Sequence, residues 1–144
     1  MKAASQALLI FISMAVLFTL SSCELVTSSD DLSGTYSYSG YTENLTLIVS
    51  GSMELEINDD AEITGSWEFS AVTPADDIGP QIGRGELIGV IEDSVIMINL
   101  NPQNADNNVM LIGGQEGNNI TGNWQYVGFQ GVINEGKFEA TKQN

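Results

Sequence analysis

Apolar side chains in this chain recur at every second position, and this period constrains the fold more than any other feature. Alternation of this kind is typical of β-strands with one buried face, whereas an amphipathic helix repeats every three to four residues. No segment from residue 33 onward shows a convincing helical period. The sequence therefore predicts an all-β fold. The alternating positions are Leu45, Leu47, Val49, Met53, Leu55, Ile57, Ile63, Trp67 and Phe69.

The three prolines mark the longest expected loops. Pro74 and Pro80 lie in the polar stretch 73–81, and Pro102 lies in the polar stretch 101–108. A proline in these stretches removes no hydrogen bond from a sheet.

The expected hairpin registers follow from keeping apolar side chains on one face, because a slip of one residue moves every side chain to the other face. A two-residue loop at 117–118 sets Leu111 opposite Trp124 and Gly113 opposite Gly122. The other two expected registers are a loop at 92–93, with Leu87 opposite Ile98 and Gly89 opposite Ile96, and a loop at 59–61, with Leu55 beside Gly65 and Met53 beside Trp67.

Residues 45–57 keep one parity throughout, so they form either one long strand bent at Gly51 or a hairpin with a loop at 50–52. We favour one strand, which gives eight in all, because an even number lets an antiparallel meander close on itself. The predicted fold is an eight-stranded antiparallel up-and-down β-barrel, and the alternative is a β-sandwich of the same strands.

A short motif occurs three times, at residues 32–38, 63–69 and 120–126, and each copy places a glycine and two aromatic residues on one face. Glycine inside a strand suggests a sharp bend or a close neighbour. Together with the short strands, these motifs resemble the calycin barrels, the group of lipocalins and avidins, over residues 33–141. The first strand carries Gly34-Thr35-Tyr36 in place of the Gly-x-Trp of that group, and no avidin-like biotin site can be carried over.

The N-terminal segment has the pattern of a secretory signal: Lys2, an apolar stretch at 7–20, and the small residues Ser21 and Ser22. The fourteen residues of this stretch rise only about 21 Å as a helix, which is short of a hydrocarbon core roughly 30 Å thick. Residues 20–23 resemble the lipobox of bacterial lipoproteins. That resemblance implies that Cys23 carries acyl chains such as palmitate and becomes the first mature residue. The alternative is an ordinary signal with a chance cysteine.

These boundaries predict a signal peptide at 1–22, an acidic polar tether at 23–32 and a barrel domain at 33–144. Glu24 follows the cysteine where retention in the inner membrane usually requires aspartate, so the resemblance implies a lipid-anchored protein of the bacterial cell envelope, in the outer membrane rather than the inner.

The mature chain is strongly acidic. Nineteen carboxylates against Arg84, Lys137 and Lys142 leave a formal charge of −16. Nucleic acids and anionic lipid surfaces would be repelled, so we expect no nucleic-acid partner, and membrane attachment has to come from acyl chains.

Few kinds of catalysis are open to this composition. The chain has no histidine, and the lone cysteine is expected to carry lipid, so the usual serine and cysteine hydrolase schemes lack a base or a nucleophile. Zinc lacks its usual ligands. Adjacent acidic pairs at 30–31, 59–60, 76–77 and 92–93 could act as acid and base or bind calcium, but turn formation and solubility explain them better. We expect no catalytic residue, no metal and no cofactor.

Seven aromatic residues are expected inside the barrel and are the candidate lining of a ligand site. An eight-stranded barrel is just wide enough to be filled by side chains or to hold one small ligand. Many aromatics favour filling, whereas inward glycines at 65, 89, 113 and 122 favour a cavity, and both remain open. The candidate lining residues are Tyr36, Tyr38, Trp67, Phe69, Trp124, Tyr126 and Phe138.

The same registers place six apolar side chains together on the outer face, which is polar elsewhere. Such a patch could exceed the apolar area usually exposed on a monomer, so it is a candidate surface for self-association or for a protein partner. The alternative is cover by the 73–81 loop or by the tether. We call these residues the outer strip: Ile88, Val90, Val95, Met97, Met110 and Ile112.

The function expected from these features is a membrane-anchored, non-catalytic lipoprotein whose barrel binds a small apolar molecule or a protein partner. Two alternatives stay open: a structural envelope protein with a fully packed barrel, and a carboxylate-type enzyme acting on glycans.

Overall fold

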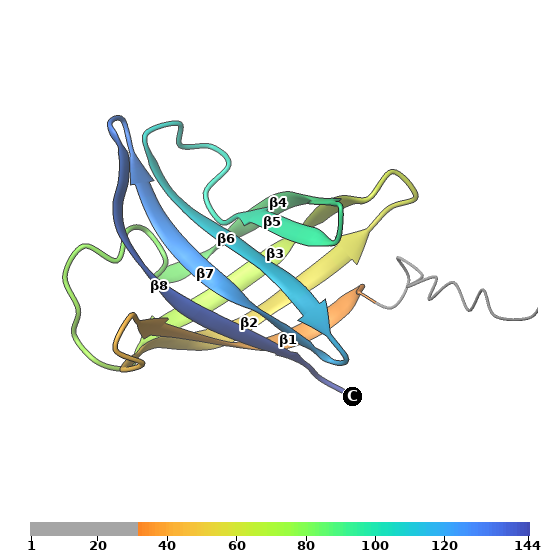
Figure 1. The fold of residues 1–144 in the computed structure, drawn as a ribbon, viewed down its shortest axis with the longest axis horizontal. Coiled ribbons are helices and arrows are strands. Elements are labelled where there is room, and N and C mark those ends of the chain that lie inside the picture. Colours follow the sequence, from red (N-terminus) through yellow and green to blue (C-terminus); the bar gives the residue numbers. More distant parts are fainter. Residues whose placement is uncertain (1–31) are drawn as a thin grey trace, which may run out of the picture.

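The computed structural model describes residues 32–144, which form eight strands and no helix (Figure 1). The strands are β1 (Gly34–Thr42), β2 (Leu47–Ile57), β3 (Glu62–Ala71), β4 (Gly83–Glu92), β5 (Val95–Asn99), β6 (Asn107–Glu116), β7 (Asn119–Gly128) and β8 (Gly131–Lys142).

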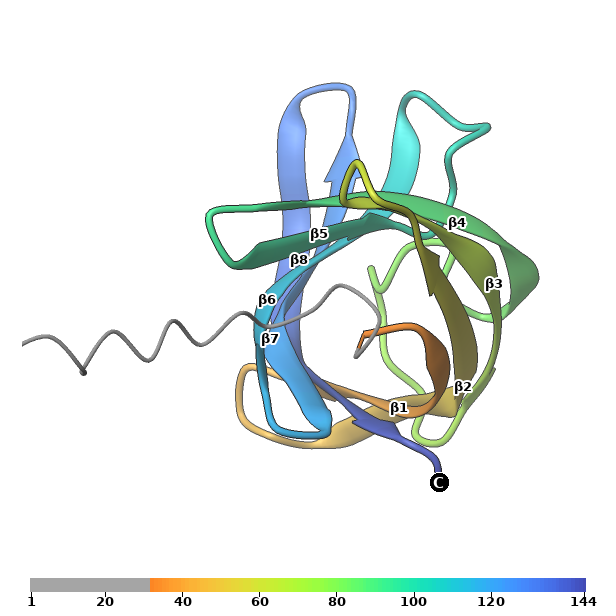
Figure 2. The ribbon, with the colours of Figure 1, turned by 90° about the vertical axis from the view of Figure 1, so that its right-hand side faces the viewer.

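The strands form one closed antiparallel barrel. Each strand pairs with the next along the chain, and β8 pairs back onto β1 from Tyr36 opposite Lys142 to Thr42 opposite Gly136. Figure 2 shows the ring of strands nearly end on. The predicted up-and-down barrel is therefore confirmed, and the sandwich alternative is excluded.

Residues 47–57 form a single strand, as favoured from the sequence, but the alternation fails at its start. A β-bulge interrupts the pairing between Gly40 and Tyr41, which lie opposite Val49 and Leu47. Ile48 is left between these partners and is 1% exposed, whereas Leu45 lies in the loop with φ of 60° and is 69% exposed. Before the bulge, the residues that face the core are those of the opposite parity, so Ile48 is part of the core and Leu45 is not.

Two of the three predicted registers are confirmed: Gly113 lies opposite Gly122, and Leu55 lies opposite Gly65. The register between β4 and β5 is wrong by two residues, because Gly89 pairs with Ile98 instead of Ile96. The turn is Asp93-Ser94, and both residues have positive φ, 48° and 69°. A shift of two residues keeps every side chain on its face, so alternation alone does not distinguish the two turns.

The two ends of the barrel differ. At one end, which we call the entry end, Leu32 is buried and its carbonyl accepts a 2.7 Å hydrogen bond from the Tyr36 hydroxyl. The tight connections β2–β3, β4–β5 and β6–β7 lie at this end, and the longer segments 43–46, 72–82 and 100–106 lie at the other, the loop end (Figure 1). The β7–β8 turn also lies at the loop end, so the chain enters the barrel at the end opposite this turn.

Candidate functional site

The aromatic residues expected inside the barrel form most of its core. Six of the seven are at most 4% exposed, and Tyr126 is partly buried against them. The ring of Tyr38 stacks on that of Phe69, with centroids 4.1 Å apart and planes 8° apart, and lies 6.0 Å from that of Phe138. The interior is therefore packed with rings in contact.

The two tryptophans also fasten the interior to the surrounding chain. The indole N–H of Trp67 donates to the carbonyl of Leu100 at 2.7 Å, and that of Trp124 donates to the carbonyl of Tyr41 at 2.7 Å. Both carbonyls lie near the loop end, where strands give way to loops. These bonds satisfy the only polar atom of each buried indole.

The inward glycines leave less space than the sequence suggested. A Cβ at Gly65 would collide with the carbonyl oxygen of Glu54, and one at Gly122 would collide with that of Ile112. The backbone of the neighbouring strand already occupies the position of the missing side chain. These glycines therefore permit sharp bending of the sheet and do not open a cavity.

Three buried side-chain atoms have no hydrogen-bond partner among residues 32–144. They are the hydroxyl of Tyr38, which is 1% exposed, the side-chain oxygen of Gln81, which is fully buried, and the side-chain oxygen of Asn108 on β6. Burial raises the pKa of Tyr38 far above its ordinary value, so this hydroxyl keeps its proton. The amide nitrogen of Gln81 donates to the carbonyl of Ile78 within the 72–82 segment, and the side-chain amide of Asn101 donates to the carbonyl of Pro80 at 3.0 Å, which ties this segment to the 100–106 segment.

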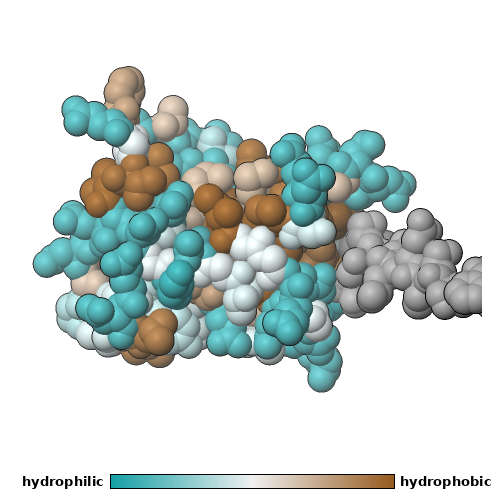
Figure 3. Space-filling model, viewed as in Figure 1, coloured by the Kyte–Doolittle hydropathy of each residue, from teal (hydrophilic) through white to brown (hydrophobic). Residues whose placement is uncertain are grey.

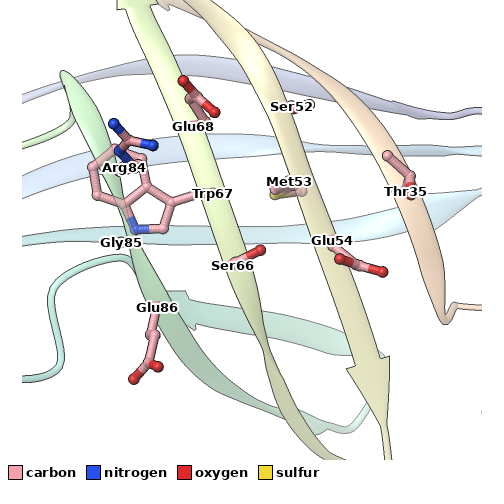
Figure 4. A pocket seen from close by; sticks show the side chains of 10 residues that line it. All are labelled: Thr35, Ser52, Met53, Glu54, Ser66, Trp67, Glu68, Arg84, Gly85 and Glu86. Atoms are coloured by element: carbon pink, nitrogen blue, oxygen red, sulfur yellow. The ribbon is translucent and has the colours of Figure 1, made fainter.

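Most clefts found on the described residues lie on the outer wall of the barrel, and one of about 200 Å³ lies at the loop end, where Ile48, Ile78 and Trp124 are among its lining residues. One of about 370 Å³ lies over β1–β4, and Figure 4 shows its polar lining. Glu54, Glu68 and Glu86 point in different directions there, and Arg84 lies across from Glu68. Residues 32–144 contain no cluster of three or more His, Cys, Asp or Glu side chains suited to hold a metal ion.

The acidic pairs do not come together into a site. Residues 59–60 and 93 lie in tight turns at the entry end, and residues 76–77 lie in the 72–82 segment at the loop end. Their separation agrees with the interpretation as turn and surface residues. The pair at 30–31 lies outside the described residues.

The outer strip lies where the sequence placed it, on the outer face of β4, β5 and β6. Val90 pairs with Met97, and Met97 pairs with Ile112, so these side chains are direct neighbours across three strands. Ile88 is 49% exposed and Val95 is 42% exposed. Figure 3 shows apolar surface near the middle of the view, over β5 and β6, with surface of intermediate hydropathy below it.

The loop expected as possible cover for the outer strip lies elsewhere. Residues 72–82 close the loop end, where Ala75 and Ile78 pack against the core. The 100–106 segment comes closer, since Pro102 and Gln103 line a cleft of about 550 Å³ together with Ile88. This cleft leaves Ile88 half exposed. The tether is not among the described residues, so cover by the tether remains untested.

Several exposed apolar residues were missed by the sequence interpretation. Phe129 is 91% exposed, and Val132 and Ile133 are each 52% exposed. They belong to the β7–β8 hairpin, whose turn is Phe129-Gln130. The available signal was Gly128 and Gly131, which flank the turn.

Cys23 lies outside the described residues, so its acylation remains a prediction. The described part of the chain has no helix long and apolar enough to cross a membrane.

Similarity to known proteins was found among solved structures. No family model matches the sequence, and a search of curated proteins found no match. Among solved structures, the crystal structure of a rhizavidin–biotin complex matches with a TM-score of 0.48 and 18% sequence identity, covering 78% of this chain and 94% of that chain. The fold of this chain is established by the pairing of its own strands, which form a closed eight-stranded antiparallel barrel.

Proposed function

We propose that this chain is a lipid-anchored protein of the bacterial cell envelope, placed in the outer membrane, whose barrel is a non-catalytic binding module. The anchor is acylated Cys23, and the module pairs with a second copy of the chain through the outer strip. The observation that carries the proposal is the combination of a packed interior with an apolar outer face.

Because the interior is packed, we place the binding surface on the outside of the barrel. The buried aromatics contact one another, and the inward glycines face backbone rather than space. Interiors packed in this way leave no room for a drug-sized molecule, which needs a pocket of roughly 300 Å³ or more.

The outer strip has the composition of a protein interface. The outward positions of β5 and of β6 up to Gly114 carry no ionisable side chain, although the mature chain has a charge of −16. Interface centres are depleted in charged residues and enriched in methionine and other large apolar side chains. A second copy presents the same uncharged face, so pairing through it brings few like charges together.

The position of the strip also suits two copies anchored in one membrane. It lies on the side of the barrel, between the entry end and the loop end (Figure 1). If two copies pair through the strip about a two-fold axis parallel to the barrel axis, both entry ends lie on the same side, where both tethers would meet the bilayer.

Native mass spectrometry of the full chain extracted from its own membrane tests this proposal. We expect a dimer whose subunit mass includes acyl chains on Cys23. Ile88→Glu with Met97→Lys should weaken pairing by about 100-fold or more, because an unpaired charge in an interface costs roughly 2–5 kcal/mol.

The matched control places the same two charges on polar outer positions beside the strip, as Thr64→Glu with Asn123→Lys, and should remain dimeric. A monomeric wild type contradicts the pairing, and an unmodified Cys23 contradicts the anchor. The two parts of the proposal are therefore tested separately.

One observation favours a second candidate, a small-molecule binder. The unpartnered hydroxyl of Tyr38 offers a donor inside the barrel, and the unpartnered side-chain oxygen of Gln81 offers an acceptor in the segment that closes the loop end. A small hydrogen-bonding ligand or a buried water would satisfy them. The same spectrum distinguishes these cases, because a retained ligand adds a discrete mass that Tyr38→Phe should remove.

A further inference from the structure

The tip of the β7–β8 hairpin is the most exposed apolar feature of the described chain. Phe129 lies in the two-residue turn and is 91% exposed, and Val132 and Ile133 follow it on β8. We call these three residues the hairpin tip. Proteins that expose large apolar side chains in a group usually do so at interaction sites.

Turn geometry does not account for Phe129. Tight turns favour Gly, Asn, Asp and Ser, which tolerate positive φ or bond to the local backbone. The turns at the entry end follow this rule, with Asp59-Asp60, Asp93-Ser94 and Gly117-Asn118. In the β7–β8 turn the flanking Gly131 takes the positive φ, 112°, so the position of Phe129 could be filled by a polar residue.

The hairpin tip also projects beyond its neighbour. Pairing between β1 and β8 stops where Thr42 meets Gly136, so residues 131–135 extend past the end of β1. The side chain of Ile133 lies across Gly128, where a Cβ would fall 2.7 Å from its Cδ1 atom. Backbone pairing and this contact hold the tip in one arrangement, which lowers the entropy lost on binding.

The direction in which the tip points rests on the proposed function. If Cys23 is anchored, the tether reaches the barrel at Leu32, at the entry end, and the hairpin tip lies at the opposite end (Figure 1). Eight residues lie between Cys23 and Leu32, and the nine steps along the chain that join them reach at most roughly 30–32 Å. The tip then faces away from the anchoring membrane, towards molecules deeper in the adjacent compartment.

The charges around the tip restrict the partner. No lysine or arginine occurs between Arg84 and Lys137, whereas the backbone of Asp106 lies beside Gly128 and Glu135 follows Ile133 by two residues. An anionic lipid surface would be repelled. A second copy that approached with its own hairpin tip would bring its own Asp106 and Glu135 towards these two residues, so like charges would meet. Complementarity requires lysine or arginine side chains on the partner.

We infer that the hairpin tip is a docking site for a different protein, one that presents an apolar pocket for Phe129 within a basic surface. This surface is separate from the outer strip in both position and partner. The strip joins two like barrels side by side, and the tip engages a protein farther from the membrane.

The test is photocrosslinking in intact cells that make the full chain with p-benzoylphenylalanine in place of Phe129. We expect one discrete adduct whose mass is neither that of a lipid conjugate nor twice that of the chain. The control carries the same photoreactive residue at Asn118, in the tight turn at the entry end, and should not form this adduct.

Two further variants separate specific docking from chance capture. Val132→Ser with Ile133→Ser should lower the adduct yield by roughly tenfold or more, because anchors at the centre of an interface carry most of its binding energy. Asp106→Asn with Glu135→Gln should lower the yield as well and leave the fold unchanged, as checked by circular dichroism.

The remaining outcomes overturn the inference. The inference is wrong if no adduct forms, if the adduct joins two copies of the chain, or if it contains lipid. It is also wrong if the photoreactive residue at position 118 gives the same adduct in equal yield, or if neither double variant lowers the yield. Fractionation of the same cells reports membrane attachment independently. A specific adduct with the chain in the soluble fraction overturns the anchor and leaves the docking site standing.

Discussion

Tyr36 and Tyr38 show at the scale of single residues how neighbouring inward side chains can differ in energy. Both are fully buried on β1, but the Tyr36 hydroxyl donates to the carbonyl of Leu32, whereas the Tyr38 hydroxyl has no partner among residues 32–144. A buried polar group without a partner costs roughly 1–3 kcal/mol. The two residues therefore make a matched pair for substitution.

We expect opposite effects from removing the two hydroxyls. Tyr36→Phe should lower the free energy of unfolding by about 1–2 kcal/mol, because it leaves the buried carbonyl of Leu32 without this donor. Tyr38→Phe should leave it unchanged or raise it by about 1 kcal/mol. Urea unfolding of both variants measures the difference, and a loss of stability in Tyr38→Phe would reveal a bound water or ligand on that hydroxyl.

The pH dependence supplies the control. Because burial raises the pKa of Tyr38, the folded chain holds this proton more tightly than the unfolded chain does. The free energy of unfolding that this proton adds is fully present below about pH 10, the pKa of tyrosine in the unfolded chain, and is lost as the pH rises above that value. Tyr38→Phe should therefore lose less stability above about pH 10 than the wild type does.

At the scale of strands, the close approach of neighbouring backbones at glycine is the feature most sensitive to substitution. Gly65→Ala would drive a Cβ into the carbonyl of Glu54, whereas a Cβ at Gly114 would have its nearest neighbour 3.8 Å away. We expect Gly65→Ala to cost about 3 kcal/mol or more, in the range of severe overpacking, and Gly114→Ala to change stability by less than about 1 kcal/mol. Thermal unfolding of the two variants measures this contrast, and equal effects would contradict the close approach.

The strands themselves could be predicted from the sequence because each carries its own alternation. The register of the hairpin with the Gly117-Asn118 turn could also be predicted, since this turn sets Gly113 opposite Gly122. The β4–β5 register did not, because moving the turn from 92–93 to 93–94 shifts the pairing by two residues and keeps the same faces buried. Bulges are harder still to predict from the sequence. The bulge at Ile48 puts this residue in the core in place of Leu45, and no feature of the composition marks it.

The candidate surfaces divide in the same way. The outer strip could be predicted because it depends only on parity along β4, β5 and β6. The hairpin tip was not predicted: Gly128 and Gly131 mark its turn, but the exposure of Val132 and Ile133 depends on how far β8 extends past β1, which is a property of the closed barrel. Local patterns do not contain that information.

For the whole molecule, the dominant long-range force is repulsion between carboxylates spread over the chain. A charge of −16 opposes compaction, and salt screens it. We expect the free energy of unfolding to rise by on the order of 1 kcal/mol between about 0.01 and 0.15 M NaCl, over which the Debye length falls from about 30 to about 8 Å.

Urea unfolding at both salt concentrations measures this effect at neutral pH. The rise should shrink near pH 4, where many carboxylates are protonated, which serves as the control. A rise of equal size at both pH values would mean that screening of carboxylates is not its source.

The closure of β1 against β8 has a mechanical consequence. β1 is hydrogen-bonded along both edges, to β2 and to β8, and the chain enters at its first residues. A pull between residue 32 and the far tip of the β7–β8 hairpin would act along the strands and load many of these hydrogen bonds at once, in shear. A barrel opened between β1 and β8 would expose one edge to peeling, bond by bond. The closed ring therefore makes this small domain a stiff connector between its two ends.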